Sequence, residues 1–476
     1  PAAQHPLAPA HPGRQDRHGS RRGRQLCSRI RFSRNRIRIG RSLRAAAPAP
    51  SAAQGHPGHD GHGNHRRLRV IKPERRTRGD LLAAGAIALV IAIVGAVIWW
   101  TSDARATDSR PAATATKSPA AAKSVPTALR QLWTAPSPYT TVPVVAGGSV
   151  VTGAGRTVTG HNPHTGEATW TYARDRELCG VTWIYSHAVA VYPDGRGCGQ
   201  VTTIDGNTGK RGSTRSGYAD EHVRLSSNGT EVLAAGDTRL ETWRSDMVRV
   251  IGFGEVDARV KPAQKGIGQG CALLSAAASP ATVAVMQSCR DQADLKLTLL
   301  KPSDQDDEPE VRDIPLPGTA ADSGARVLAV SETSVVIYLP GPRPRVVIYD
   351  ETGNEVSSTD LPAPPTPEAL QNAAVSPAGG LITWWTGHDL VVFNATALAF
   401  RYIIPGGPAA LLGPATMMAN ELLIPVVGGL AVYEASAGTF ERVIAVDRAA
   451  TPGPVVPAVA GKTVLEQRGD TVVALG

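Results

Sequence analysis

The stretch Asn162-Pro-His-Thr-Gly-Glu-Ala-Thr-Trp170 joins two runs of strand-forming residues through a Thr-Gly turn. Its pattern returns at Asp205-Gly-Asn-Thr-Gly-Lys210 and Tyr349-Asp-Glu-Thr-Gly-Asn-Glu355, and more loosely at Tyr433-Glu-Ala-Ser-Ala-Gly-Thr-Phe440. A repeat of roughly 40 to 50 residues that holds four short strands is typical of a β-propeller blade. The sequence therefore predicts an all-β domain in which blades surround a common axis.

The number of blades follows from the hairpins that join the third strand of each repeat to the fourth. After the first, they are predicted near Gly209, Asp246, Asp304, Gly353, Ala395 and Gly438. Three further strands, at 454–459, 462–466 and 471–475, lack a fourth. We expect Leu129–Trp133 to supply it, because closing the ring removes exposed sheet edges. The prediction is an eight-bladed propeller, with seven blades as the alternative and a single helical turn at 366–374.

The first repeat also carries a family resemblance. Val144-Val-Ala-Gly-Gly-Ser-Val-Val151, followed by the Asn162 hairpin, resembles the repeat of pyrroloquinoline-quinone-type (PQQ-like, quinoprotein-type) propellers, and the likeness extends over 128–476. That family includes quinone-cofactor dehydrogenases and non-catalytic members such as the outer-membrane assembly lipoprotein of Gram-negative bacteria. The chain is also similar to single-pass membrane proteins of actinobacteria that carry such a domain. The resemblance implies either a quinone enzyme or a binding scaffold.

The residues favour the scaffold over the enzyme. The family's alcohol dehydrogenases stack their cofactor on a ring formed by two neighbouring cysteines, and this sequence has no adjacent cysteine pair. Trp170 is the only tryptophan in a Thr-Gly hairpin, so most docking tryptophans of the family are missing. We therefore expect a protein that is not an enzyme and that uses no cofactor.

Charge divides the chain into two parts. Residues 1–78 contain 19 Lys and Arg but 3 Asp and Glu, a net charge of +16, whereas residues 79–476 contain 31 and 38, a net charge of −7. The basic arm, 1–79, has no apolar period and is predicted to be disordered. The first methionine is Met247, so we also expect that part of this arm is a mis-assigned start and that Val70 is the true one. Nucleic-acid binding is not predicted.

A membrane helix is predicted over 80–100. Leu81–Trp100 contains no charged residue, and 20 helical residues span about 30 Å, the thickness of a bilayer core. Lys72, Arg75, Arg76 and Arg78 precede it, so the positive-inside rule places the N-terminus in the cytoplasm and the propeller outside. The alternative is a signal peptide cleaved after Ala104-Arg-Ala106. Residues 101–126 are rich in Ala, Pro, Ser and Thr and are predicted to be a solvated tether to a propeller at 127–476.

Four of the five cysteines form two pairs of similar spacing. Cys179 and Cys198 are 19 residues apart, and Cys271 and Cys289 are 18 residues apart. In both repeats the first cysteine opens the innermost strand and the second follows the end of the next strand, so antiparallel pairing brings them together. We predict two disulfides, as expected in an oxidising outer compartment. Cys27, in the basic arm, is left unpaired.

Other candidate sites are weaker. His56, His59, His62 and His65 lie in the arm without a carboxylate or cysteine cluster, so no metal site is predicted. Asp304-Gln-Asp-Asp-Glu-Pro-Glu310 resembles a Ca²⁺ loop but lacks its glycine and its final glutamate. Trp384-Trp385 is either an exposed recognition patch or core. His187 heads an apolar strand, and no Gly-x-Ser-x-Gly motif accompanies it.

These observations predict a function without catalysis. We expect a propeller anchored in the cell membrane by one helix, which binds envelope or membrane proteins through its loops and acts as a scaffold. A quinone-dependent or other ligand-binding enzyme and a transmembrane sensor are the alternatives. No small-molecule substrate is indicated.

Overall fold

The computed structural model describes residues 77–102, 105–256, 268–303, 309–449 and 453–476. Several sequence predictions lie outside these residues: the basic arm with its start near Val70, the histidine tract, Cys27, Ala104 of the proposed cleavage site, and residues 304–308 of the acidic run. Within the described ranges the chain forms one long helix, two short 3-10 turns and strands.

Helix α1 (Arg78–Trp100) corresponds to the predicted apolar segment. Thr77 caps its N-terminus: its Oγ1 accepts a hydrogen bond from the Asp80 backbone N–H (3.2 Å), and Asp80 Oδ2 accepts one from the Thr77 N–H (2.8 Å). This capping box fixes the start of the helix. The helix has a mean hydropathy of 2.9, and its length and composition suit a membrane span.

The first four blades are antiparallel meanders, as predicted. Blade 1 consists of β3 (Val144–Ala146), β4 (Ser149–Ala154), β5 (Thr157–His161) and β6 (Ala168–Arg174), with β1 (Thr107–Arg110) added at its outer edge. Blade 2 consists of β7 (Gly180–Ile184), β8 (His187–Asp194), β9 (Gly197–Asp205) and β10 (Arg211–Ser216). Blade 3 consists of β11 (Arg224–Ser227), β12 (Glu231–Ala235), β13 (Arg239–Arg244) and β14 (Arg249–Gly254). Blade 4 consists of β15 (Cys271–Ala278), β16 (Val283–Cys289), β17 (Asp294–Lys301) and β18 (Glu310–Ala320).

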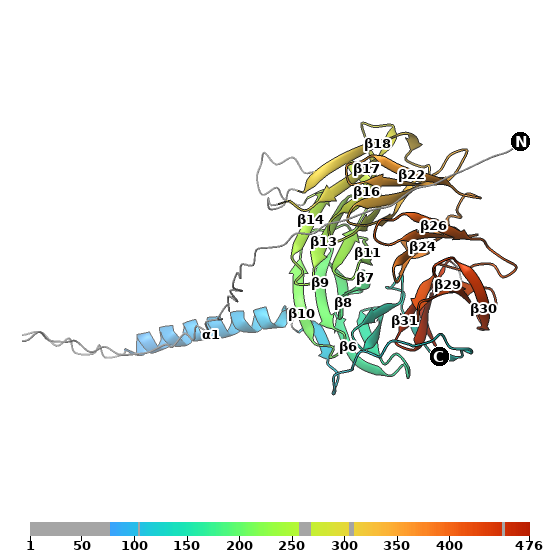
Figure 1. Ribbon diagram of the computed structural model, residues 1–476. Coiled ribbons are helices and arrows are strands. Elements are labelled where there is room, and N and C mark those ends of the chain that lie inside the picture. Colours follow the sequence, from blue (N-terminus) through green and yellow to red (C-terminus); the bar gives the residue numbers. More distant parts are fainter. Residues whose placement is uncertain (1–76, 103–104, 257–267, 304–308, 450–452) are drawn as a thin grey trace, which may run out of the picture. The chain divides into compact units, whose positions relative to one another are not determined.

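The remaining four blades complete the ring (Figure 1). Blade 5 consists of β19 (Arg326–Val330), β20 (Ser334–Leu339), β21 (Arg345–Asp350) and β22 (Glu355–Asp360). The turns η1 (Glu368–Leu370) and η2 (Asn372–Ala374) precede blade 6, which consists of β23 (Val375–Ala378), β24 (Leu381–Trp385), β25 (Leu390–Asn394) and β26 (Phe400–Ile404). Blade 7 consists of β27 (Thr416–Met418), β28 (Glu421–Val426), β29 (Gly429–Glu434) and β30 (Thr439–Ala445). Blade 8 consists of β31 (Val455–Ala460), β32 (Thr463–Arg468), β33 (Thr471–Leu475) and β2 (Gln131–Pro136).

Ring closure by the two ends of the domain is confirmed. Strand β2 pairs antiparallel with β33, so that Thr134 lies opposite Val473. The strand runs a few residues beyond the predicted 129–133. Eight blades, and not seven, therefore close the ring.

An aromatic side chain of one blade docks on the Thr-Gly turn of the next. Trp133 Nε1 donates to the Pro163 carbonyl (3.0 Å), and a Cβ at Gly166, which has a positive φ of 74°, would collide with its ring. Trp170 Nε1 donates to the Gly206 carbonyl in the same way (3.0 Å). In blade 6 a tyrosine replaces the tryptophan, since Tyr402 packs on the turn that precedes β30. The repeat therefore requires glycine in these turns because a large ring occupies the place of a side chain.

The segment after the helix differs from the predicted tether. Strand β1 pairs with β6, Thr107 opposite Arg174, and the following residues 111–126, here called the strap, pack against the propeller. The Thr116 N–H donates to the Asn207 carbonyl (2.9 Å), the Lys117 carbonyl packs against Gly148, and Val125 is buried in the core of blades 7 and 8. Over 107–126 the chain therefore docks on the propeller, although most of its side chains remain exposed to solvent as expected of a tether. Backbone hydrogen bonds, which need no apolar period, hold the strap.

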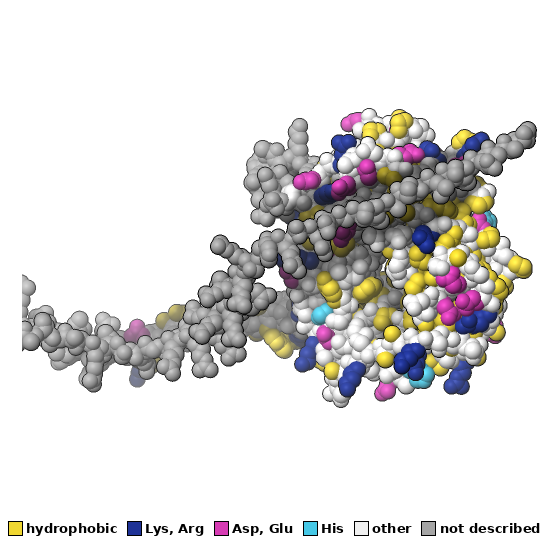
Figure 2. All heavy atoms as spheres, in the orientation of Figure 1, with side chains coloured by type: hydrophobic (Ala, Val, Ile, Leu, Met, Phe, Trp, Pro, Cys, Tyr) yellow, Lys and Arg dark blue, Asp and Glu magenta, His cyan; other side chains and the backbone are white. Residues whose placement is uncertain are grey.

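Hydrophobic cores lie between neighbouring blades. The second and third strands of most blades are almost entirely buried, and their side chains fill the space to the next sheet. One cluster joins blades 5, 6 and 7 through Val336, Trp384 and Leu422. Charged side chains of both signs are scattered over the visible outer surface (Figure 2). This packing makes the ring a rigid frame for the loops on its two faces.

Candidate functional site

The meander gives the propeller two different faces. Turns between the first and second strands, and between the third and fourth strands, lie on one face, here called the turn face. The hairpins between the second and third strands, and the links from one blade to the next, lie on the other, here called the link face. The strap contacts Asn207, Gly148 and Gly461, which all belong to turns of the turn face.

A cavity lies on the link face, at the mouth of the central channel. Its volume is about 420 Å³. The blade-to-blade links and the first residues of the innermost strands line it, namely Pro138, Tyr139, Thr141, Cys179, Gly180, Val181, Val223, Arg224, Leu225, Leu274, Arg326, Leu370, Gln371, Asn372 and Ala373. A second cavity of about 370 Å³ lies deeper in the channel and shares Thr141, Val181, Leu225 and Asn372 with the first.

Arg326 is one of two arginines in the cavity wall. It is the first residue of β19, and its Nη2 donates to Asn372 Oδ1 in η2 (2.6 Å). Its Nε is buried and has no hydrogen-bond acceptor. Among the described residues, no carboxylate lies within ion-pair distance of its guanidinium. Burial, and secondarily the like charge of Arg224, lower the pKa of Arg326 to about 10, so it stays charged at neutral pH.

Arg224 is a second guanidinium in the cavity wall, and it is compensated. Its Nη1 forms an ion pair with Asp237 Oδ1 (3.0 Å), and its Nη2 donates to the carbonyls of Gly236 (3.2 Å) and Leu273 (3.4 Å). Arg224 is the first residue of β11, just as Arg326 is the first residue of β19. The two arginines therefore occupy the same position of the repeat, two blades apart.

The rest of the wall is mostly apolar. Leu225, Leu274, Leu370 and Val181 contribute aliphatic surface, and Tyr139 and Gln371 contribute polar groups. The described lining residues include no acidic side chain and no histidine. An arginine with spare donors beside apolar walls suits a ligand that carries an anionic group on an apolar body.

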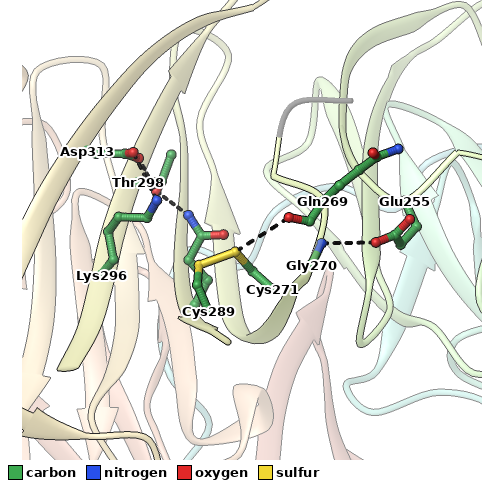
Figure 3. Close-up of a disulfide and its surroundings, with 9 residues drawn as sticks. Glu255, Gln269, Gly270, Cys271, Cys289, Lys296, Thr298 and Asp313 are labelled. Atoms are coloured by element: carbon green, nitrogen blue, oxygen red, sulfur yellow. Dashed lines mark hydrogen bonds and ion pairs between the residues drawn. A yellow bond between two sulfur atoms is a disulfide. The ribbon is translucent and has the colours of Figure 1, made fainter. Parts of the chain in front are cut away.

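Two disulfides brace the same face. The bonds Cys179–Cys198 and Cys271–Cys289 form as predicted from the sequence. Cys271 and Cys289 are register partners in β15 and β16 (Figure 3). Cys198, however, is the second residue of β9, so the first bond reaches the third strand of its blade and not the end of the second. Cys179 also lines the cavity, which places a covalent link in its wall.

Polar contacts support the second disulfide (Figure 3). The Gly270 N–H, next to Cys271, donates to Glu255 Oε1 (3.0 Å). On the outer strands of blade 4, Asp313 accepts hydrogen bonds from Thr298 Oγ1 (2.6 Å) and Lys296 Nζ (2.9 Å). The first contact holds the link between blades 3 and 4 beside Cys271, and the other two join the third and fourth strands of blade 4.

The other sequence candidates lie elsewhere. Trp384 and Trp385 are both buried, and their indole N–H groups donate to the carbonyls of Ala369 (2.9 Å) and Leu411 (3.1 Å), so they form core and not an exposed patch. His187 begins β8 on the turn face, with its Nε2 3.9 Å from Asp205 Oδ2. Of the acidic run, Glu310 begins β18, and most of the run lies outside the described residues. Among the described residues no group of three His, Cys, Asp or Glu could hold a metal ion.

Sequence reasoning missed the arginines. The signal that would have found them is the alignment of the repeats, since Arg224 and Arg326 both stand at the first residue of an innermost strand. Such positions face the channel mouth, where a charged residue has no role in the core. Asn372 was missed because η2 is specific to the link before blade 6.

Comparisons with known proteins do not assign a family. No family model matches the sequence, and no curated protein matches it. Three solved structures illustrate the similarity in fold. BamB from Moraxella catarrhalis is 13% identical, covering 73% of this chain and 99% of BamB, with a TM-score of 0.44. Sqt1 from Saccharomyces cerevisiae is 11% identical, covering 76% and 99%, with a TM-score of 0.43. The dihydro-heme d1 dehydrogenase NirN is 11% identical, covering 64% and 66%, with a TM-score of 0.41.

Proposed function

We propose that the protein is a membrane-anchored, extracytoplasmic binding scaffold of the cell envelope and that it recognises a protein partner through its link face without catalysing a reaction. The observation that carries this proposal is Arg326, a half-buried arginine in a cavity of that face whose buried Nε has no acceptor and whose charge no described carboxylate balances. A closed ring with two disulfides on the same face holds the cavity residues in place before a partner arrives. Such preorganisation reduces the entropy lost on binding.

The proposal also places helix α1 in the cell membrane and the propeller outside the cytoplasm. Helix α1 has the length and hydropathy of a membrane span, and Lys72, Arg75 and Arg76 before it favour a cytoplasmic N-terminus. Disulfides persist in oxidising compartments, which fits a propeller outside the membrane. The proposal includes that the chain is a non-catalytic PQQ-like propeller of the kind that actinobacterial membrane proteins carry.

Site-specific photocrosslinking in cells that express the full chain tests the binding face. A photoreactive residue replaces Gln371, at the cavity on the link face, or Lys210, in a turn of the turn face. We expect a discrete crosslinked protein from position 371 and a much weaker product from position 210. Crosslinking only from position 210, or from neither position, would contradict the proposed binding face.

Reporter fusions test the topology. A periplasm-active reporter after Gly476 should be active, and the same reporter ahead of Lys72 should be inactive. The reverse pattern would refute the extracytoplasmic placement.

A further inference from the structure

We infer that Arg326 and Asn372 bind a carboxylate of the partner, presented on an acidic residue that has apolar neighbours in its peptide chain. This inference rests on the proposed function and names the chemical group that the link face recognises.

Charge is the first argument. Three other largely buried arginines of the propeller have acidic partners: Arg448 and Arg468 both contact Glu466, and Arg239 contacts Glu241. Arg326 has only the neutral amide of Asn372. A cation that is partly removed from water without an opposite charge is unfavourable, and an anion that enters the cavity relieves that cost. No carboxylate of the described residues therefore balances the charge of Arg326, and a negatively charged group of the partner would do so.

Donor geometry is the second argument. A guanidinium has five N–H donors in one plane, and Asn372 accepts from one of them. Because Asn372 accepts through Oδ1, its amide nitrogen remains a donor beside the same guanidinium. Planar carboxylates accept two parallel hydrogen bonds from such a fork, which makes arginine the preferred partner for them.

The walls are the third argument. Leu225, Leu274 and Leu370 surround the charge with aliphatic surface, and the volume of about 420 Å³ lies within the range of about 300–1,000 Å³ found for small-ligand pockets. A cavity of this size accommodates an acidic side chain and a neighbouring apolar side chain, while the partner's backbone stays on the link face. Fully hydrated inorganic anions would gain nothing from the leucines.

Thermal unfolding of the full chain in detergent micelles tests the carboxylate. The probes are isovalerate, its neutral analogue isovaleramide, inorganic phosphate, and the peptides acetyl-Leu-Glu-Leu-amide and acetyl-Leu-Gln-Leu-amide, all at matched ionic strength. A ligand that binds the folded state raises Tm with increasing concentration. We expect isovalerate and the glutamate peptide to raise Tm, and isovaleramide and the glutamine peptide to leave it unchanged.

Variants assign the effect to the site. Arg326→Gln should weaken the apparent affinity for both acidic probes by at least about tenfold, as the loss of a charge-assisted contact does, and Arg326→Lys should retain part of it. The matched control is Arg343→Gln, an exposed arginine in a hairpin of the link face, which should leave the affinity unchanged. Without ligand, Arg326→Met should unfold at a Tm equal to or above that of the wild type, since it removes an uncompensated charge.

Several outcomes would overturn the inference. Equal Tm shifts in Arg326→Gln and the wild type would show that the acid binds elsewhere. An equal shift with phosphate would show a general anion site, and a shift with isovalerate but not with the glutamate peptide would assign the cavity to a free small acid. If crosslinking from position 371 persists unchanged in Arg326→Gln, the inference fails while the proposed function stands. If the wild type itself gives no crosslink from that position, the proposed function fails.

Discussion

Glu466 offers a test of what holds blades 7 and 8 together. Its side chain on β32 is fully buried and contacts two arginines: Arg448, from the link after β30, and Arg468. Arg448 Nε donates to Glu466 Oε2 (2.9 Å), and its Nη1 donates to the carbonyls of Val426 (2.9 Å) and Gly429 (2.6 Å). One carboxylate thus balances two buried cations where the last two blades meet.

Replacing Glu466 with Gln keeps the shape and removes the charge. Removing one partner of a buried ion pair costs about 3–5 kcal/mol, because the remaining charge stays buried without compensation. Unfolding entropy is roughly 2.1 cal/mol/K per residue, so for a propeller of this size a loss of about 4 kcal/mol lowers Tm by about 5 °C. Differential scanning calorimetry of the full chain in micelles measures this shift.

The control for this prediction is Glu441→Gln. Glu441 forms an ion pair with Arg442 (3.0 Å) on the exposed strand β30, and surface pairs contribute about 0–1 kcal/mol. Its Tm should therefore change by no more than about 1 °C. The reasoning is refuted if Glu466→Gln unfolds within 1 °C of the wild type, or if both variants shift by the same amount.

Three further predictions concern the closure and the disulfides. Trp133→Ala should destabilise the ring by about 2–4 kcal/mol, because it removes a large half-buried ring and its hydrogen bond to the next blade, and calorimetry should detect a Tm lowered by several degrees. His161 stacks on Trp133 with ring centroids 5.5 Å apart, and burial lowers its pKa below 6.5 despite the opposing bond to Gly166, so the unfolded chain binds the proton more readily. The stability that depends on neutral His161 should therefore be fully present above about pH 6.5 and be lost as the pH drops below it. His161→Gln should flatten this pH dependence of Tm, and the control His164→Gln, at an exposed histidine, should not. Each disulfide closes a loop of 18 or 19 residues and contributes roughly 3 kcal/mol. The double variant Cys271→Ala/Cys289→Ala should therefore have a lower Tm under oxidising conditions, and reductant should cause no further loss from that site. A non-reducing peptide map with crossed pairs would contradict the bonds described.

The fold was largely predictable because it repeats. Each Thr-Gly turn marks one hairpin, and the surplus strands at the two ends could complete only one blade, so the pairing of β2 with β33 followed from counting. The docking residues were harder to foresee. Tyr402 performs in blade 6 what Trp133 and Trp170 perform in blades 8 and 1, and the shared requirement is a large side chain over a glycine, not a tryptophan.

The strap and the site were not predictable for a different reason. Lys117 and Pro119 lie against Gly148 and Gly461 through backbone and ring contacts, which leave no periodic signal in a segment rich in Ala, Pro, Ser and Thr. Arg326 lacks a motif because its importance depends on what surrounds it, namely a cavity wall drawn from several blades. Only the assembled ring brings those residues together.

The added strand β1 and the strap also determine how mechanical load would enter the domain. A pull on the chain ahead of Thr107 acts first on the β1–β6 ladder, next on the strap, and only then on β2. The closing strand, which keeps all eight blades in one ring, is therefore the last to bear tension. Rupture of the β1–β6 ladder would therefore lengthen the connection between α1 and the propeller by releasing chain, while the ring stays closed.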